Sequence, residues 1–552
     1  MTDGYKEAKE SFVSGMTGSS IGHINMLCSV PLVAVALYAA IRTRITPARS
    51  IGFVLSWTLL VLPMLLAMTV GAEKPAYLIA GLGLALLIVL RKPRAEAGTP
   101  LPSNVPLSPS TPRHATVPKP QTRRISPLPA LTTYRAHMMM MTVLAILAVD
   151  FPVFPRLLAK CETYGVSMMD LGVGSFVFSQ GIVSAIPLIR DPTYITAPMF
   201  PKLVSVTKKS LPVIALGIIR VLLVKGTEYP EHVTEYGVHW NFFITLALLP
   251  ILQVLLHPLI RVLPASAVGF LVALAQQAAL SQFNLRDYVL TAPRTSLISA
   301  NKEGLVSLTG YLAIQLLGLS IGTVILPPTP SFLYRRQAAL AAQQDYSGGR
   351  KRRFSDPAVD KHISTDATFA FDAPRQNDKI ATELCAYAIL WWGLLGFARV
   401  IRLDGSWGAG GGASRQTVNM TYILWVAAFN TSFLLAYLVV LDMWIFPPPK
   451  ESSKSKHGKG KEALRTANAK EYNNLPATAS PIANVTGNPP RLLDVLNKHG
   501  LNVFLLANVL TGAVNLSMKT MYASDFWALI VLSTYSLVVC GIPWFLERNN
   551  IS

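Results

Sequence analysis

Thirteen apolar runs divide this chain, each near the ~17 to 25 residues that a helix needs to cross a bilayer. They are centred near residues 34, 60, 83, 144, 181, 218, 248, 272, 316, 392, 432, 509 and 535, and those near 83, 144 and 218 are shorter. Apolar residues make up 51% of the chain and charged residues 14%, which a single water-soluble globule could not accommodate. The pattern predicts an all-α, multi-pass membrane protein with about 13 transmembrane helices.

The basic residues separate onto the two sides of such a protein. With thirteen helices threaded, 35 of the 49 Lys and Arg residues fall in linkers on one side, 11 fall on the other side, and three lie within helices. Because cytosolic loops carry the basic excess, we expect a luminal N-terminus and a cytosolic C-terminus. Residues 1–552 are predicted to form one integral-membrane domain. Its intervals 91–136, 327–380 and 447–499 are predicted to be flexible basic cytosolic loops.

Charge and cysteine content exclude two other classes of protein. The formal net charge of +20 is dispersed over the loops and lacks the aromatic interleaving of an RNA-binding module, so no nucleic-acid partner is predicted. The four cysteines are scattered, without CxxC or Cys/His ligand spacing. Neither a zinc site nor a disulfide framework is therefore expected, and no bound metal is predicted.

A short luminal connection after the fourth apolar run is the first candidate for chemistry. It places Asp150 at the end of one predicted helix and Lys160 in the following loop, separated by the Pro-bounded stretch 151–155. Ionisable groups at a membrane boundary cost free energy unless they are used. In the functional interpretation, Asp150 accepts a proton from a substrate hydroxyl and Lys160 stabilises negative charge on an acyl oxygen or phosphate. In the alternative, a helix-end aspartate pairs with an interfacial lysine.

Three arginines are candidates for binding an anionic headgroup. Arg220 interrupts the sixth apolar run roughly 7 to 8 Å from its luminal end, at ~1.5 Å per residue. Arg399 and Arg402 lie three residues apart, on one face near the luminal end of the tenth run. Together they predict a positive mouth for an anionic lipid. Snorkelling of Arg220 to the interface is the alternative.

The linker over residues 228–241 concentrates polar and aromatic side chains beside that mouth. A metal site is one interpretation, but the HExxH pattern is absent, and hydrogen-bonded interfacial residues are favoured. A substrate-orienting role is the third interpretation. The candidates in this linker are His232, Tyr236, His239, Trp240 and Asn241.

Two further residues have alternative roles. Asn515 lies in an apolar run, where a buried amide either bridges helices or contacts substrate. Cys161, next to Lys160, is a conceivable acyl carrier, because a nearby cation favours the nucleophilic thiolate. We favour direct transfer over that covalent route.

Long motifs in the chain resemble one family of membrane enzymes. They are Tyr5-Lys-Glu-Ala-Lys-Glu-Ser-Phe-Val-Ser14, Asp150-Phe-Pro with Phe154-Pro-Arg, Ala159-Lys160, Met169-Asp-Leu-Gly-Val-Gly-Ser-Phe-Val-Phe178, Glu231-His-Val-Thr-Glu-Tyr-Gly-Val-His-Trp-Asn241, Lys302-Glu-Gly304 and Leu506-Ala-Asn508. On these motifs the sequence resembles the GPI-anchor inositol acyltransferase family, which includes the fungal GPI-anchored wall transfer protein and mammalian PIG-W. The likeness covers most helices and luminal loops.

The resemblance implies an acyl-CoA-dependent inositol O-acyltransferase of the endoplasmic reticulum membrane. Such an enzyme moves a fatty acyl chain, typically palmitoyl from palmitoyl-CoA, to the inositol ring of glucosaminyl-phosphatidylinositol. Its partners are these two substrates and membrane lipids, with palmitoyl-CoA as co-substrate and no bound cofactor. The family's functional Asp and Lys fall on Asp150 and Lys160. Antifungal compounds directed at the fungal members are expected to bind here.

The sequence differs from the family at one position of interest, and two other functions are alternatives. The family commonly has Arg-Arg-Phe-Ala-Lys where this chain has Arg156-Leu-Leu-Ala-Lys160, so no role for the second Arg is transferred. A lipid or small-molecule transporter or flippase also suits charged groups in Pro-broken helices. A non-catalytic scaffold for GPI assembly is the other rival.

Overall fold

A computed structural model describes residues 8–9, 11–12, 14–45, 51–93, 125, 128–191, 193–225, 233–337, 375–403, 412–445 and 489–549. Most of the three predicted cytosolic loops and His232 lie outside these residues. The described parts of all three predicted loops include helix: α6 (Pro129–Ala148) begins inside the first, α18 (Asn377–Val400) begins inside the second, and residues 491–498 of the third form a helix that buries leucines at positions 492, 493 and 496. Those leucines belong to a helix that packs against α6, so the ends of these loops are part of the helical body.

The described chain is helical, and its regular structure outside helices is a single antiparallel bridge between Ser19 and Val166. The elements are α2 (Ile21–Arg44), α3 (Phe53–Leu60), α4 (Leu62–Met68), α5 (Pro75–Leu90), α6 (Pro129–Ala148), η1 (Arg156–Leu158), α7 (Met168–Arg190), α8 (Met199–Lys225), α9 (Val233–Tyr236), α10 (Phe242–Leu255), α11 (His257–Val262), α12 (Ala265–Gln282), α13 (Leu285–Thr291), α14 (Leu297–Ala300), α15 (Lys302–Ile325), α18 (Asn377–Val400), α19 (Met420–Tyr437), the π-helical η3 (Leu438–Ile445), α21 (Arg491–Lys498), α22 (Gly500–Ser517), η4 (Thr520–Tyr522) and α23 (Asp525–Asn549). The all-α prediction is confirmed for the described residues.

Each of the thirteen apolar runs is centred in a helix, although not every helix is long enough to cross a bilayer alone. Among the described residues, eight helices qualify by length and apolar composition, or nine if α12 and α13, bent by 67°, form one span. The run near residue 60 is divided at Val61 into α3 and α4, and α5 and α10 are shorter apolar helices. The total of thirteen spans and the orientation of the termini stay predictions.

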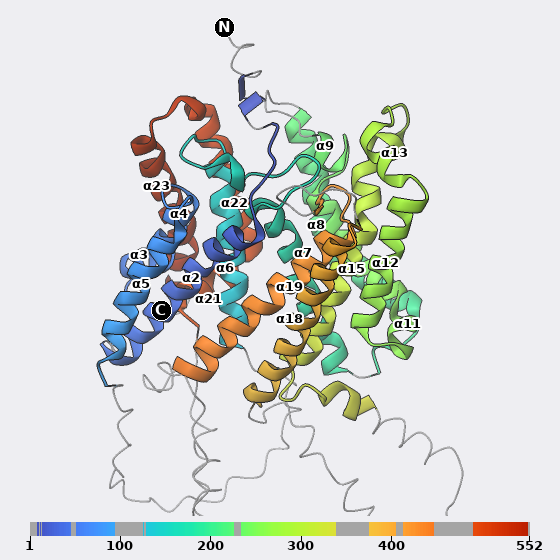
Figure 1. Cartoon of the computed structure of the whole chain (residues 1–552), viewed down its shortest axis with the longest axis horizontal. Helices are drawn as coiled ribbons and strands as arrows, with labels where there is room; N and C mark the ends of the chain where they lie inside the picture. The colour runs from blue at the N-terminus through green and yellow to red at the C-terminus, as the bar shows by residue number, and fades with distance from the viewer. Residues whose placement is uncertain are drawn as a thin grey trace, which may run out of the picture.

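The helices form one body whose middle is built from α6, α7, α15 and α19 (Figure 1). Helices α3, α4, α5 and α23 lie on one side of this centre, and α11, α12 and α13 lie on the other (Figure 1). Helix α15 is the most enclosed candidate span, with 83% of its apolar window buried. The central helices are therefore the rigid frame on which the surrounding segments are placed.

Close approach of α7 and α15 depends on glycine. A Cβ added at Gly181 would lie 2.1 Å from the backbone oxygen of Gln315, and one at Gly318 would lie 2.2 Å from that of Phe178. Small residues permit such backbone contact between membrane helices, where apolar lipid supplies little driving force for association. This contact fixes the position of α7, whose first turn reaches the candidate site.

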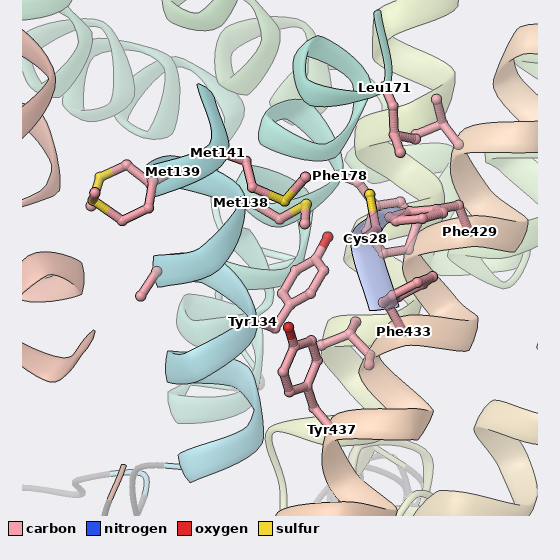
Figure 2. Packing of buried hydrophobic residues seen from close by; sticks show 14 of the residues in the cluster. Cys28, Tyr134, Met138, Met139, Met141, Leu171, Phe178, Phe429, Phe433 and Tyr437 are labelled. Atoms are coloured by element: carbon pink, nitrogen blue, oxygen red, sulfur yellow. The ribbon is translucent and has the colours of Figure 1, made fainter. Parts of the chain in front are cut away.

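Buried polar contacts hold α6 against α19. Figure 2 shows Tyr134 and Met138 of α6 on the side that faces Tyr437. The Tyr134 hydroxyl donates to the Asn430 side-chain oxygen, and His137 Nδ1 lies 2.6 Å from the Tyr437 hydroxyl. Buried polar groups in an apolar interior need such partners. The contacts fix α6, which carries Asp150 just beyond its C-terminus.

Candidate active site

A cavity of about 560 Å³ opens where the connection after α6 meets α7, α9 and α22. Its wall follows α6 and the residues after it from Met138 to Asp150, a length of roughly 18 Å at 1.5 Å per residue. The charged residues in its lining are Lys9, Asp150, Lys160, Glu162, Arg220, Glu235 and Arg415. Along α6 the lining is mainly apolar, with Met138, Met141, Ala145 and Val149 before Asp150, and Cys28, Leu171, Phe176 and Phe504 add further apolar side chains. One cavity thus joins a polar region to an apolar one.

Asp150 belongs to a buried cluster of three side chains drawn from distant parts of the sequence. Its Oδ1 lies 3.3 Å from the Lys9 ammonium, and its Oδ2 accepts a 2.8 Å hydrogen bond from Asn515 Nδ2. Lys9 also donates to Asn515 Oδ1 at 2.9 Å, which closes the triangle. The Asp150 side chain is 2% exposed, so these contacts replace the water that a carboxylate needs. The carboxylate is held in one orientation.

Arg156 shapes the turn that follows Asp150. Its guanidinium donates to the backbone oxygens of Val149, Phe151 and Phe154 at 2.8 to 3.2 Å. These carbonyls follow the end of α6, where helical partners are missing. Burial lowers the pKa of Arg156 to about 10, while nearby Asp150 acts in the opposite direction, so the side chain is cationic at neutral pH. Arg156 therefore positions the turn.

Lys160 pairs with Glu235. Its ammonium lies 2.8 Å from both carboxylate oxygens, and the two side chains are 35% and 18% exposed. Asp150 and Lys160 line the same cavity, as the sequence leads one to expect, but each makes its ion pair with a different residue. The interpretation of Asp150 and Lys160 as a simple ion pair is therefore wrong.

A second buried ion pair joins Arg415 to Asp170, which lies in the first turn of α7. Arg415 Nε donates to Asp170 Oδ1 at 2.7 Å. Asp170 Oδ2 accepts from the Cys161 backbone N–H at 3.0 Å and from the Ser167 hydroxyl at 2.8 Å. Ser167 also caps α7, so the pair is built into the helix start. Burial, followed by the charge of Asp170, raises the pKa of the Cys161 thiol, which disfavours a thiolate acyl carrier.

The predicted substrate-binding residues divide into two groups. Those that line the cavity are Arg220, Tyr236, Trp240 and Asn241. Asn241 caps α10 by accepting from the Phe243 N–H, so part of its polarity serves the fold. Burial raises the pKa of Tyr236, which keeps its hydroxyl protonated.

The other predicted residues lie elsewhere. His239 is absent from the cavity wall, and its backbone N–H donates to Asn301. Arg399 and Arg402, at the end of α18, also do not line the cavity, so the predicted mouth of three arginines does not form around it. Helix α18 ends at Val400, and Arg402 lies beyond it with a φ of +54°, so the helix that would place both arginines on one face does not extend to Arg402. Asn515 contributes by contacting Asp150.

Sequence reasoning missed four charged residues of this site: Lys9, Asp170, Glu235 and Arg415. Lys9 and Arg415 are far from Asp150 and Asp170 in the sequence, so no local spacing links them. A signal was available for Lys9, Asp170 and Glu235, because all three occur inside the motifs that carry the family resemblance, whereas Arg415 lies outside them. Among the described residues, no group of three or more His, Cys, Asp or Glu side chains could hold a metal ion.

Comparisons with known proteins cover nearly the whole chain. The model of the family described as GWT1 matches residues 5–546. The chain is 34% identical to GPI-anchored wall transfer protein 1 of Cryptococcus neoformans var. neoformans and 36% identical to that of Aspergillus oryzae. The first alignment covers 99% of both chains, and the second covers 100% of this chain and 99% of its relative. It is 40% identical to the Cryptococcus neoformans var. grubii protein over 77% of this chain and 63% of that relative.

Proposed function

Because this chain belongs to the GWT1 family of GPI-anchored wall transfer proteins, which implicates it in GPI-anchor biosynthesis, we propose that it is an inositol O-acyltransferase. It moves a fatty acyl chain, palmitoyl in the first instance, from acyl-CoA to the inositol ring of glucosaminyl-phosphatidylinositol. The reaction takes place at the endoplasmic reticulum membrane. Acyl-CoA is a co-substrate, and the proposal needs no resident cofactor.

The observation that carries this proposal is the two-part cavity. An acyl donor has an apolar tail and a polar thioester end, and the cavity offers an apolar region along α6 that leads to Asp150 and Lys160. Its volume of about 560 Å³ is within the ~300 to 1,000 Å³ of ligand sites. Exposed apolar side chains elsewhere, such as Ile389 and Phe397 of α18, provide the surface for membrane lipids.

The contacts support a direct transfer in which Asp150 is the general base. Asp150, oriented by Lys9 and Asn515, accepts the proton of the inositol hydroxyl as that oxygen attacks the thioester carbonyl. The C–S bond then breaks, the new C–O ester bond is complete, and the departing thiolate takes the proton from Asp150. Negative charge develops on the carbonyl oxygen of the thioester during this step. Lys160 leaves Glu235 and stabilises that charge.

Purified full-length protein in nanodiscs tests this proposal. It is incubated with labelled palmitoyl-CoA and glucosaminyl-phosphatidylinositol, and the lipid product is examined before and after mild alkali. An acyltransferase forms a labelled lipid whose acyl-inositol ester is removed by alkali. A transporter or flippase would move lipid between leaflets without forming this bond, and a scaffold would form product only with another enzyme present. Either result would overturn the proposal.

A further inference from the structure

The stretch 412–419, which leads into α19, is buried although it is not helical. Side chains from another helix satisfy its backbone: Gln276 donates to the Thr417 oxygen at 2.8 Å, and Gln277 accepts from the Met420 N–H at 3.0 Å. Irregular backbone among membrane helices is tolerated where it is enclosed by protein or lines a cavity. This stretch does both, because Arg415 reaches the cavity wall.

The conformation of this stretch is strained and closely held. Val418 has a φ of +46°, a left-handed conformation that β-branched residues rarely adopt. A Cβ added at Gly310 of α15 would lie 2.5 Å from the Val418 oxygen, so α15 packs directly on the strained residue. Such strain persists where the surroundings over-determine it. The consequence is that Arg415 is presented from a fixed position.

Within the described part of the chain, the Arg415 guanidinium has one donor nitrogen that is paired and one that is not. Its Nε donates to Asp170, whose second oxygen already accepts from Cys161 and Ser167. Its Nη1 is buried and has no hydrogen-bond partner among the described residues. The whole side chain is 3% exposed, so water does not readily compensate for the missing contact. A buried guanidinium donor without an acceptor is costly unless a ligand supplies one.

The other cations that line the cavity differ from Arg415 in their donors. Lys9 and Lys160 direct their ammonium groups to carboxylates, and Arg220 is exposed. Arg415 also pairs with a carboxylate, Asp170, but it does so through Nε and keeps a buried Nη1 that has no hydrogen-bond partner among the described residues. Arg415 therefore combines burial, a fixed orientation and an unused donor. The guanidinium fork matches the oxygens of a phosphate group, and exclusion of water strengthens such a contact.

We propose that Arg415 is a phosphate-binding residue of the cavity, oriented by Asp170. This inference rests on the proposed function, because both proposed substrates carry phosphate. The group bound is either the phosphodiester of the inositol lipid or a phosphate of coenzyme A. The contact holds its substrate with the reacting end beside Asp150 and Lys160.

Arg415→Lys in the full-length protein tests the assignment. The lysine keeps a positive charge opposite Asp170 but loses the second donor. One KM is expected to rise by about 10- to 100-fold, the equivalent of one charge-assisted hydrogen bond, while kcat changes less. A raised KM for the lipid identifies its phosphodiester, and a raised KM for acyl-CoA identifies a coenzyme A phosphate. Unchanged values of both would overturn the assignment. Arg286→Lys, in the exposed pair with Asp287, is the matched control and should change neither.

A binding measurement separates this inference from the proposed function. Coenzyme A and glycerophosphoinositol, which need no turnover, are titrated against the wild-type protein, Arg415→Lys and the charge-matched pair Arg415→Met with Asp170→Asn. Weaker binding of one probe to both variants supports the site, even if the wild type forms no acyl-inositol. If the wild type transfers acyl groups but all three proteins bind both probes equally, the assignment of Arg415 as a phosphate-binding residue is wrong and the proposed function is unaffected.

Discussion

The cavity contains two lysine–carboxylate pairs that differ in their exposure to water. Lys9 and Asp150 are 8% and 2% exposed, whereas Lys160 and Glu235 are 35% and 18% exposed. Removing one partner of a buried ion pair costs about 3 to 5 kcal/mol, because a charge is left uncompensated. A pair close to water is worth about 0 to 1 kcal/mol. Lys9 is therefore committed to Asp150, while Lys160 can leave Glu235 for a substrate at little cost.

The largest effect on turnover is expected from Asp150→Asn. The amide keeps the shape of the side chain but cannot accept the hydroxyl proton, so the acyl-transfer rate should fall by about 10²- to 10⁴-fold. The measurement is kcat with palmitoyl-CoA and lipid at saturation, normalised to folded protein. Asp287→Asn, at an exposed aspartate, is the control and should behave as the wild type. Normal turnover in Asp150→Asn would remove Asp150 as the base.

Lys160→Met should separate activity from stability. We expect kcat to fall by about 10²- to 10³-fold, the usual loss for one donor to a developing oxyanion. The unfolding temperature should change little, because the pair with Glu235 is partly exposed. Glu235→Gln should lower kcat much less, since it leaves the ammonium in place. A large loss of thermal stability in Lys160→Met would mean that this pair is structural, and the contrast with Lys9 would fail.

Lys9→Met should mainly reduce stability. The substitution leaves Asp150 buried with Asn515 but without its counter-charge, and the expected cost is about 3 to 5 kcal/mol. Adding Asp150→Asn should recover much of this loss, because the uncompensated charge is then removed. Thermal unfolding of the two single variants and the double variant in the same detergent measures the coupling. Additive losses would show that Lys9 and Asp150 do not form a pair in solution.

The smallest effect is expected at the two arginines that the structure places away from the cavity wall. Arg399→Ala and Arg402→Ala should leave both KM values within about twofold of the wild type, since a change far from a site rarely couples to it. Arg220→Ala, in the cavity wall, should raise the KM for the lipid by more than either. A larger rise in the KM for the lipid with Arg399→Ala than with Arg220→Ala would support the lipid-binding mouth that sequence spacing predicted.

The sequence located part of the site because that part depends on local order. Charge in a Pro-bounded connection between apolar runs pointed to Asp150 and Lys160, and an unusual linker pointed to Tyr236 and Trp240. All four line the cavity. The partners could not be predicted in the same way, because Lys9 and Asn515 are 506 residues apart and Arg415 and Asp170 are 245 apart. No pattern of neighbouring residues specifies such pairs.

Apolar periodicity and length were sufficient to predict a helical membrane protein, because a helix in lipid must satisfy its own backbone. The thirteen apolar runs coincide with helices for the same reason. Which carboxylate meets which lysine depends on how those helices pack, and the packing is set by contacts such as Gly181 against Gln315. The buried end of Arg415 likewise exists only after α7, α15 and the strained stretch before α19 have come together. Charge pairing in this protein is a property of packing, since burial and orientation arise only when distant segments meet.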